Sequence, residues 1–222
     1  GRGDVYKRQV TVPFKEQAWQ LVSGRTARAE LAGAVNTLVF GNAGIVGDNT
    51  DGAGLLRDIT HNLRCPLLAR RVLLLGAGGA ARGVSGPLLD ARPTALVIAN
   101  RTPARAHALA GHLAPLGAVT GSSYSELAGQ SFDIVINATS ASLGDALPPL
   151  PPGLFAAGSL AYEMMYGRDD TPFLAFARAQ GAEQLADGLG MLVEQAAEAF
   201  HVWRGVRPDV TPVLAMLRNS GA

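Results

Sequence analysis

A glycine-rich segment at residues 76–81 has the types and spacing needed to hold a dinucleotide. It fits the pattern G-x-G-x-x-[G/A]. The first glycine permits a tight turn, the second lets the backbone approach a pyrophosphate, and Ala81 is small enough for a helix to pack on a sheet. Free N–H groups at a helix N-terminus favour phosphates. The alternative is a tight turn without a ligand. The predicted cofactor contacts are Gly76, Ala77, Gly78, Gly79 and Ala80.

The residues after the next expected strand indicate which dinucleotide is bound. NAD is usually held by a carboxylate at this place. This sequence instead has Asn100, Arg101 and Thr102, with Arg105 one helical turn later. Two guanidinium groups suit a phosphate, so the pattern predicts NADP as the cofactor. The alternative is that Asn100 caps the following helix and that both arginines are solvated.

Hydride transfer also requires a group that exchanges a proton with the substrate, and a lysine or a carboxylate can supply it. Lys7 and Lys15 are the only lysines of the chain. Lys15 stands at the expected start of a helix, where the helix dipole disfavours a positive charge. It is either functional or a solvated surface lysine. Asp51, in the segment GDNTDG, is either functional or the N-cap of a helix.

Other chemistries find little support in the sequence. There is no G-x-S-x-G segment, no H-E-x-x-H segment and no pair of cysteines, so neither a nucleophile nor a metal site is predicted. Four histidines lie in expected helices at irregular spacing and are interpreted as surface or packing residues. They are His61, His107, His112 and His201.

The elements that must position these residues alternate between strands and helices from about residue 70 onward. Continuous apolar strands are typical of a buried parallel sheet, and their alternation with helices predicts a doubly wound, Rossmann-like α/β domain. The expected strands cover residues 72–75, 96–99, 133–137 and 159–162, and the helices between them cover 80–89 and 103–113.

The rest of the chain predicts a second, smaller α/β unit and a helical tail. Residues 1–8 show no periodicity and are interpreted as a frayed end, a remnant of cloning or the stump of a truncation. Expected strands cover residues 10–12, 36–40 and 45–46, and expected helices cover 15–22 and 51–63. The tail helices are expected at 171–179, 191–203 and 211–217, packed elsewhere than on the edge of the sheet.

Composition excludes several classes of protein. The chain has 222 residues, 48% hydrophobic and 17% charged, which is enough for a buried core. Its net charge of +1 without a basic block argues against nucleic acid as a partner. Its apolar runs are shorter than the roughly 20 residues that cross a membrane. A single cysteine, Cys65, fits a reducing compartment, so a cytoplasmic protein acting on a small molecule is expected.

Eight segments together resemble the shikimate dehydrogenase family. They occur in the order of that family and extend over nearly the whole chain, from about Gln9 to Leu217. Singly each segment is a weak signal, but eight in one order are specific. They are residues 10–15 (VTVPFK), 34–37 (AVNT), 47–52 (GDNTDG), 76–80 (GAGGA), 100–102 (NRT), 137–140 (NATS), 171–174 (TPFL) and 187–192 (DGLGML).

The resemblance implies an oxidoreductase that reduces 3-dehydroshikimate to shikimate with NADPH, in aromatic amino-acid biosynthesis. It implies that Lys15 and Asp51 are the catalytic pair. The implied substrate contacts are Thr11, Asn36, Tyr166 and Gln195. Further implied cofactor contacts are Ala138, Thr139, Ser140, Met164 and Gly188.

The resemblance also implies two domains with the site in the cleft between them. Residues 52–187 would form the NADP-binding domain, and residues 1–51 and 188–222 the substrate-binding domain, which the C-terminal helices complete. A monomer or a homodimer is expected. The alternatives are a quinate/shikimate dehydrogenase that also accepts NAD, and a catalytically silent NADP-binding relative.

The chain departs from the family pattern at its front. Family members carry about fifty residues before the VTVPFK segment, including a Ser-x-Ser motif that holds the substrate carboxylate, and nothing in residues 1–9 matches them. The expectation is that the chain as given binds NADP but reduces dehydroshikimate poorly or not at all. A milder departure is Glu163, where the family usually has Asp.

Overall fold

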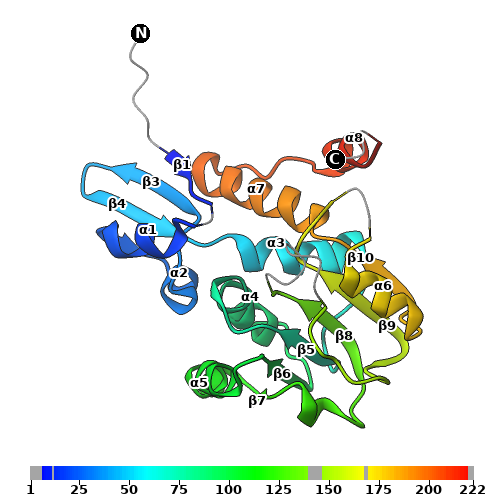
Figure 1. The fold of residues 1–222 in the computed structure, drawn as a ribbon. Coiled ribbons are helices and arrows are strands. Elements are labelled where there is room, and N and C mark those ends of the chain that lie inside the picture. The colour runs from blue at the N-terminus through cyan, green and yellow to red at the C-terminus, as the bar shows by residue number, and fades with distance from the viewer. Residues whose placement is uncertain (1–6, 12, 140–146, 168–169, 220–222) are drawn as a thin grey trace.

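The computed structural model describes residues 7–11, 13–139, 147–167 and 170–219. Within these residues the strands form two sheets, and helices α3 and α7 lie between them (Figure 1). The smaller sheet has the strand order β1-β3-β4-β2 and the larger one the order β10-β9-β8-β5-β6-β7. The strands are β1 (Lys7–Gln9), β2 (Gly24–Arg25), β3 (Thr37–Gly41), β4 (Gly44–Asp48), β5 (Arg71–Leu75), β6 (Ala95–Ala99), β7 (Val119–Ser122), β8 (Phe132–Asn137), β9 (Phe155–Glu163) and β10 (Gln184–Ala186).

The helices fill the layers around these sheets. The α-helices are α1 (Lys15–Leu21), α2 (Ala27–Ala32), α3 (Asp51–Arg57), α4 (Gly79–Asp90), α5 (Pro103–Leu113), α6 (Pro172–Ala179), α7 (Leu189–Arg204) and α8 (Thr211–Asn219). One turn of π-helix, η1 (Asp58–Asn62), continues α3. Two short 3₁₀ segments are η2 (Ala114–Leu116) and η3 (Ser125–Leu127).

The larger sheet is parallel throughout and buried on both faces. Leu74 packs in a core with α3, α4 and α5, whereas Leu73 and Leu75 pack against α6 and η3. The chain runs from β5 outward through β6 and β7 and then returns to β8 on the other side of β5. The strand order therefore reverses between β5 and β8, and a ligand crevice is expected at such a reversal. The predicted doubly wound α/β fold is confirmed.

The smaller sheet is mixed, with β1 and β4 antiparallel to β3, and β2 parallel to β4. Its core contains Val22, Ala29 and Val35, with Trp19 and Leu38 packed against them. The two sheets comprise residues 7–48 and 71–186. The predicted domain limits at residues 51/52 and 187/188 stay predictions.

Helices α3 and α7 lie side by side and connect the two sheets (Figure 1). Gly54 makes this approach possible, because a Cβ there would lie 2.7 Å from the backbone nitrogen of Gln195. At the far end of α7, the Trp203 indole N–H donates to the backbone oxygen of Leu38, at 3.0 Å. Helix α7 of the tail thus reaches the smaller sheet, as expected for a tail that packs away from the edge of the larger one.

Several elements differ from their predictions. Lys7 to Gln9 pair with β3, so the expectation of a frayed end over residues 1–8 is wrong for Lys7 and Arg8. The strand expected at 10–12 stands at 7–9, and Val10 and Thr11 are in no element. Pro13 has no N–H for strand pairing, so the strand cannot continue through it. Val12 lies outside the described residues. Elements β2, α2, β7 and β10 were not predicted, because each is too short for a clear apolar period.

An ion-pair network fixes α2 and β4 against α7. Arg28 donates from Nε and Nη2 to the two oxygens of Asp48, each at 2.6 Å, and from Nη1 to Glu198 at 2.8 Å. Asp48 and Glu198 are both buried. Burial raises the pKa of Asp48, but hydrogen bonds from Arg28 and Thr26 outweigh it and hold the pKa below its usual value. The carboxylate is therefore ionised at neutral pH and depends on Arg28.

Arg28→Met is expected to lower the free energy of unfolding by about 2 kcal/mol at pH 7, because it leaves Asp48 buried without a counter-charge. A carboxyl whose pKa is lowered on folding stabilises the fold above its unfolded pKa and loses this contribution as pH falls. The deficit of the variant is thus expected to shrink below about pH 4. Urea unfolding at both pH values measures it. Arg178→Met is the matched control, since its pair with Asp170 is exposed.

Candidate active site

Lys15 and Asp51, 36 residues apart in the sequence, meet in an ion pair. The distance from Lys15 Nζ to Asp51 Oδ2 is 2.6 Å, and the side chains are 25% and 10% exposed. Lys15 is the first residue of α1, and its carbonyl accepts from the amide of Val35. The solvated-lysine alternative is therefore wrong. Asp51 is the first residue of α3, but the N-cap is Thr50, so the N-cap alternative is wrong as well.

A buried polar network holds the second oxygen of this carboxylate. The Asn36 side-chain amide donates to Asp51 Oδ1 at 2.8 Å and to Thr50 Oγ1 at 2.9 Å. Its own carbonyl oxygen accepts from the Thr50 backbone N–H at 2.9 Å. Gln195 Oε1 lies 3.4 Å from both Asn36 Nδ2 and Thr50 Oγ1. The network therefore brings together Asn36, Asp51 and Gln195, three of the predicted site residues.

The glycine-rich loop has the geometry that the sequence predicts. Gly76 has φ +107°, a conformation that favours glycine, and Gly78 is the N-cap of α4. A Cβ at Gly78 would meet nothing within 4 Å, so the backbone there faces open space. A Cβ at Gly83, one turn into the same helix, would lie 3.7 Å from Asp51 Oδ2. The loop and the ion pair thus border the same helix.

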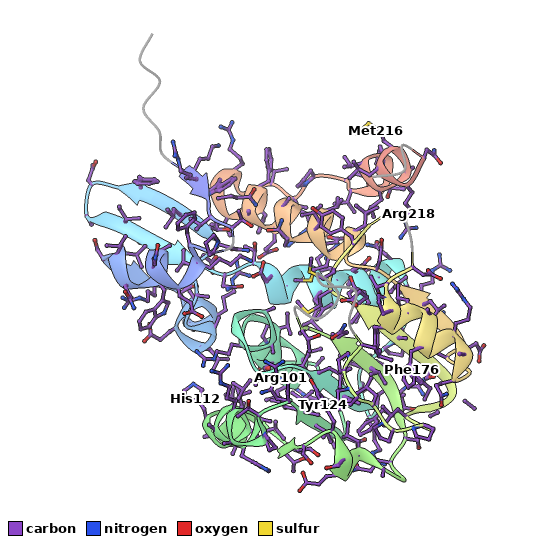
Figure 2. All side chains as sticks on the ribbon, viewed as in Figure 1. Arg101, His112, Tyr124, Phe176, Met216 and Arg218 are labelled. Atoms are coloured by element: carbon purple, nitrogen blue, oxygen red, sulfur yellow. The ribbon has the colours of Figure 1, made fainter. Side chains whose placement is uncertain are left out.

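A pocket of about 570 Å³ opens beside this loop, between α4 and α5 on one side and α1 and α2 on the other. Figure 2 shows His112 on α5, on the side that faces α2. Arg105, Arg82 and His112 supply its basic groups, whereas Glu16 and Glu30 supply acidic ones. The predicted residues Ala77, Gly78, Gly79 and Arg105 all line it.

The remaining residues of the predicted phosphate site are not among those that line the pocket. Asn100 is half-buried and Arg101 is exposed; neither lines the pocket. The backbone of Arg101 faces the hydroxyl of Tyr124, and both residues follow strands of the larger sheet (Figure 2). Asn100 donates to the backbone oxygen of Thr102, which is the N-cap of α5. The alternative that Asn100 caps this helix is therefore wrong, whereas its second part, two solvated arginines, agrees with the exposure of both Arg101 and Arg105.

The predicted contacts on the other side of the loop also come together. A Cβ at Gly76 would lie 3.1 Å from the carbonyl oxygen of Ala138, at the end of β8. The Met164 amide donates to Asn137 O at 3.0 Å, and a Cβ at Gly188 would lie 2.2 Å from Met164 O. Met164 directly follows β9, and Gly188 is the N-cap of α7. We call these two residues together the β9 wall. Thr139 donates to Asn137, and Ser140 lies outside the described residues.

Two predicted substrate contacts lie apart from the network. Thr11 and Tyr166 are exposed. The backbone oxygen of Thr11 accepts from the Phe14 amide at 2.9 Å, which forms the turn that leads into α1. Glu163, the residue that differs from the family pattern, is fully buried and accepts from Asn137 Nδ2 at 2.7 Å.

Sequence reasoning missed several residues that border the site. Thr50 lies within the GDNTDG segment, and a hydroxyl beside Asp51 was the available signal. Arg82 follows Gly79 by three positions, and His112 follows Arg105 by seven, so both spacings place them on the pocket side of their helices. Glu16 also lines the pocket, and it was missed because only its neighbour Lys15 was considered as a candidate.

Two further features were searched for among the described residues. Within them, no group of three or more His, Cys, Asp or Glu side chains is arranged to hold a metal ion. No helix in the described part of the chain has the length and apolar character needed to cross a membrane.

Comparison with known proteins identifies the family. Residues 59–144 match the model of the shikimate / quinate 5-dehydrogenase family, and residues 188–218 match that of the shikimate 5'-dehydrogenase C-terminal domain. The chain is 63% identical over 209 residues to the shikimate dehydrogenase (NADP(+)) of Dechloromonas aromatica, a match that covers 94% of this chain and 76% of that protein. It belongs to the shikimate dehydrogenase family.

Other members of the shikimate dehydrogenase family support the same assignment. The enzyme of Aromatoleum aromaticum is 64% identical over 95% of this chain and 76% of its own length. The solved structure of shikimate 5-dehydrogenase from Thermus thermophilus, in complex with NADP(H) and shikimate, superposes with a TM-score of 0.83 at 32% identity, covering 96% of this chain and 78% of that one. Both relatives are NADP(+) enzymes, so the cofactor that the residues after β6 predict is confirmed.

Gly78→Ala is expected to weaken NADPH binding by about tenfold or more without destabilising the fold. The added methyl meets no protein atom, and the backbone at φ −88° and ψ −169° tolerates alanine. It would instead occupy the space that a pyrophosphate needs, and a loss of about 1.4 kcal/mol is tenfold in Kd. Titration calorimetry and thermal melting measure the two effects.

Gly111→Ala is the matched control for this variant. Gly111 lies within α5, a Cβ there also meets nothing within 4 Å, and it does not line the pocket. The change is expected to stabilise the helix by about 0.5–1 kcal/mol and to leave NADPH affinity unaltered. Equal NADPH affinity in Gly78→Ala and the parent chain would contradict the placement of the cofactor.

Proposed function

We propose that this chain catalyses the reversible NADPH-dependent reduction of 3-dehydroshikimate to shikimate, in aromatic amino-acid biosynthesis, with Lys15 and Asp51 as its catalytic pair. The observation that carries the proposal is the 2.6 Å ion pair between them, beside the helix that begins at the glycine-rich loop. Reduction of a carbonyl needs a proton for its oxygen, and this pair has an acidic N–H group beside α4, where a Cβ at Gly83 would lie 3.7 Å from Asp51 Oδ2.

The ammonium of Lys15 has three N–H donors, of which Asp51 takes one. The other two bond to none of the residues that the structure describes and can bind the carbonyl oxygen of the substrate and give it a proton as negative charge develops there. Asp51 holds the ammonium in place by a charge-assisted hydrogen bond, while Asn36 fixes the carboxylate through its second oxygen. When bound, NADPH supplies the hydride.

The residues that would recognise the hydroxyl groups of the substrate surround this pair. Asn36 and Gln195 present amide groups within the network, and Gln195 is also held through its Nε2 by Leu192 O at 3.0 Å. We assign Thr11 and Tyr166 to the exposed side of the same site. Amide and hydroxyl side chains both donate and accept, so they suit a polyhydroxylated ring.

The charges on the β6 side of the loop indicate which end of the cofactor lies there. Arg105 lies in the pocket on the β6 side, and no carboxylate follows β6 at Asn100, Arg101 or Thr102. This side suits the 2′-phosphate of NADP. The pyrophosphate fits the N-terminus of α4, where Gly78 faces open space. The nicotinamide is then assigned to the opposite side, at the ends of β8 and β9.

The same assignment leads to proposals for the partners, the location and the oligomeric state of the protein. A small molecule is the proposed partner, and neither nucleic acid nor a membrane is expected. We also propose a cytoplasmic location, consistent with the single cysteine Cys65, and a monomer or homodimer. Quinate is a second candidate substrate, because the matching family model covers both shikimate and quinate dehydrogenases. A catalytically silent relative is disfavoured, since the Lys15–Asp51 pair is formed.

Lys15→Ala is expected to lower the kcat for 3-dehydroshikimate by about 100-fold or more, with the Kd for NADPH within about twofold of the parent. Steady-state oxidation of NADPH measures kcat. Lys7→Ala is the control, because it removes the only other lysine, which lies on β1 over the Trp203 ring. Near-normal turnover by Lys15→Ala would exclude the proposed role.

This assay is best run on two proteins. The chain covers 76% of the Dechloromonas aromatica relative, so the second protein is this chain extended to that relative's full length. Turnover in either protein supports the reaction, and their ratio measures how much the extension contributes. No turnover in either protein, with NADPH binding intact, would favour the silent relative.

Arg105→Ala is expected to raise the KM for NADPH by about tenfold or more and to leave the KM for NADH unchanged. A hydrogen bond to a charged group contributes about 1.5–3 kcal/mol, and only NADPH carries the 2′-phosphate. Arg101→Ala should have a smaller effect, because Arg101 lies outside the pocket. Arg178→Ala, on α6, is the neutral control. Equal losses with both cofactors would count against NADP selectivity at Arg105.

A further inference from the structure

Another buried carboxylate, Asp58, follows the end of α3 that is opposite to Asp51. Asp58 is 1% exposed and begins the π-helical turn η1. Its Oδ2 accepts from the hydroxyl of Tyr162 on β9 at 2.6 Å, and its Oδ1 accepts from Asn62 at 2.8 Å. Tyr162 is fully buried as well. The proposed catalytic mechanism uses neither residue. Burying a carboxyl and a hydroxyl group is costly unless each has a hydrogen-bond partner, which here is the other group.

The first turn of α7 lies directly on this pair. A Cβ at Gly190 would lie 2.1–2.2 Å from the atoms of the Asp58 carboxyl group, so only glycine fits there. The backbone amide of Met191 also faces the Tyr162 hydroxyl. A carboxylate is favoured at a helix N-terminus by the helix dipole. Elements η1, β9 and α7 therefore meet at Asp58 and Tyr162.

The surroundings of the pair raise the pKa of both Asp58 and Tyr162. Burial raises the pKa of Asp58, and nearby Glu194 raises it further, whereas Tyr162, Asn62 and Arg218 lower it. Burial and the neighbouring Asp58 raise the pKa of Tyr162 well above its usual value, so its hydroxyl is always protonated near neutral pH. Tyr162 is thus the donor, and removing its hydroxyl leaves a buried acceptor unpaired.

The pair lies next to the β9 wall. Met164 follows Tyr162 by two positions, and Gly188 precedes Gly190 by two. The Gly188 amide donates to Met165 O at 2.9 Å, which joins the two halves of the wall. Each half is therefore attached to the Asp58–Tyr162 pair, one through β9 and one through α7.

We propose that Asp58 and Tyr162 are positioning residues that hold the β9 wall in place for the nicotinamide half of NADP. The proposal rests on the proposed function, which assigns the nicotinamide to this side of the loop. Because α3 is continuous from Asp51 to η1, the pair also sets the distance of the wall from the catalytic carboxylate, over about 10 Å of helix.

The test compares two ligands on one protein. NADPH carries a nicotinamide, whereas 2′-phospho-ADP-ribose contains the rest of the molecule without it. Tyr162→Phe is expected to raise the Kd of NADPH about tenfold by calorimetry and to leave the Kd of 2′-phospho-ADP-ribose within about twofold. Asp58→Ala should do the same. The double variant should be no weaker than either single one, because both changes remove one interaction.

Two variants separate positioning from folding stability. Asp58→Asn keeps the shape and an acceptor for Tyr162, so it should bind NADPH within about threefold of the parent. Asp133→Ala removes the partner of the Arg71 amide at the amino end of the same sheet, and it should lower the melting temperature without changing either Kd. Ser159→Ala, on β9, removes a buried hydroxyl that has no hydrogen-bond partner among the described residues and should be neutral.

The outcomes distinguish this proposal from the proposed function. Parallel changes in both Kd values, or no change in either, would overturn the positioning role while leaving the function intact. A parent chain that binds NADPH no better than 2′-phospho-ADP-ribose would also overturn the positioning role alone. A parent chain that binds neither ligand would overturn the proposed function, and this proposal with it.

Discussion

The desolvation of three carboxylates on one short segment is the constraint on which the structure depends. Asp48, Asp51 and Asp58 are all buried, within eleven consecutive residues. A buried carboxylate is costly unless it is paired or hydrogen-bonded, and each of these three finds its partner on a different element. Arg28 comes from α2, Lys15 from α1 and Tyr162 from β9. The segment therefore fixes α1, α2 and the larger sheet relative to one another.

The three pairs differ in what they contribute. Arg28 binds Asp48 through two nitrogens and extends the network to Glu198, which makes it a structural connection between the smaller sheet and α7. The pair of Lys15 and Asp51 is partly exposed and borders α4, the helix that begins at the dinucleotide loop, so it is available for chemistry. The pair of Tyr162 and Asp58 is sealed from water and holds backbone elements in place.

The sequence alone predicts those parts of the structure whose cause is local. The apolar run at residues 72–75 and the glycines that follow specify a strand, a tight turn and a helix without any distant partner, and the structure has them in this order. Short elements such as β2 and β10 depend on pairing with β4 and β9, so the sequence shows no periodicity from which they could be predicted. The contact of Asp58 with Tyr162 joins residues 104 positions apart, and only the folded chain brings them together. Lys15 and Asp51 were singled out as candidates, but their pairing depended on the family resemblance.

Lys15 also shows how a locally unfavourable residue is retained by its role. A cation in the first turn of a helix costs about 0.3–1 kcal/mol, because the N-terminus of the helix carries partial positive charge. Asp51 stands in the first turn of α3, where a carboxylate is favoured for the same reason. The ion pair thus places the ammonium of α1 against the carboxylate of α3 and offsets the cost of its position. Stability alone gives no reason to place a cation at the start of α1, and such local conflicts are expected where a site performs chemistry.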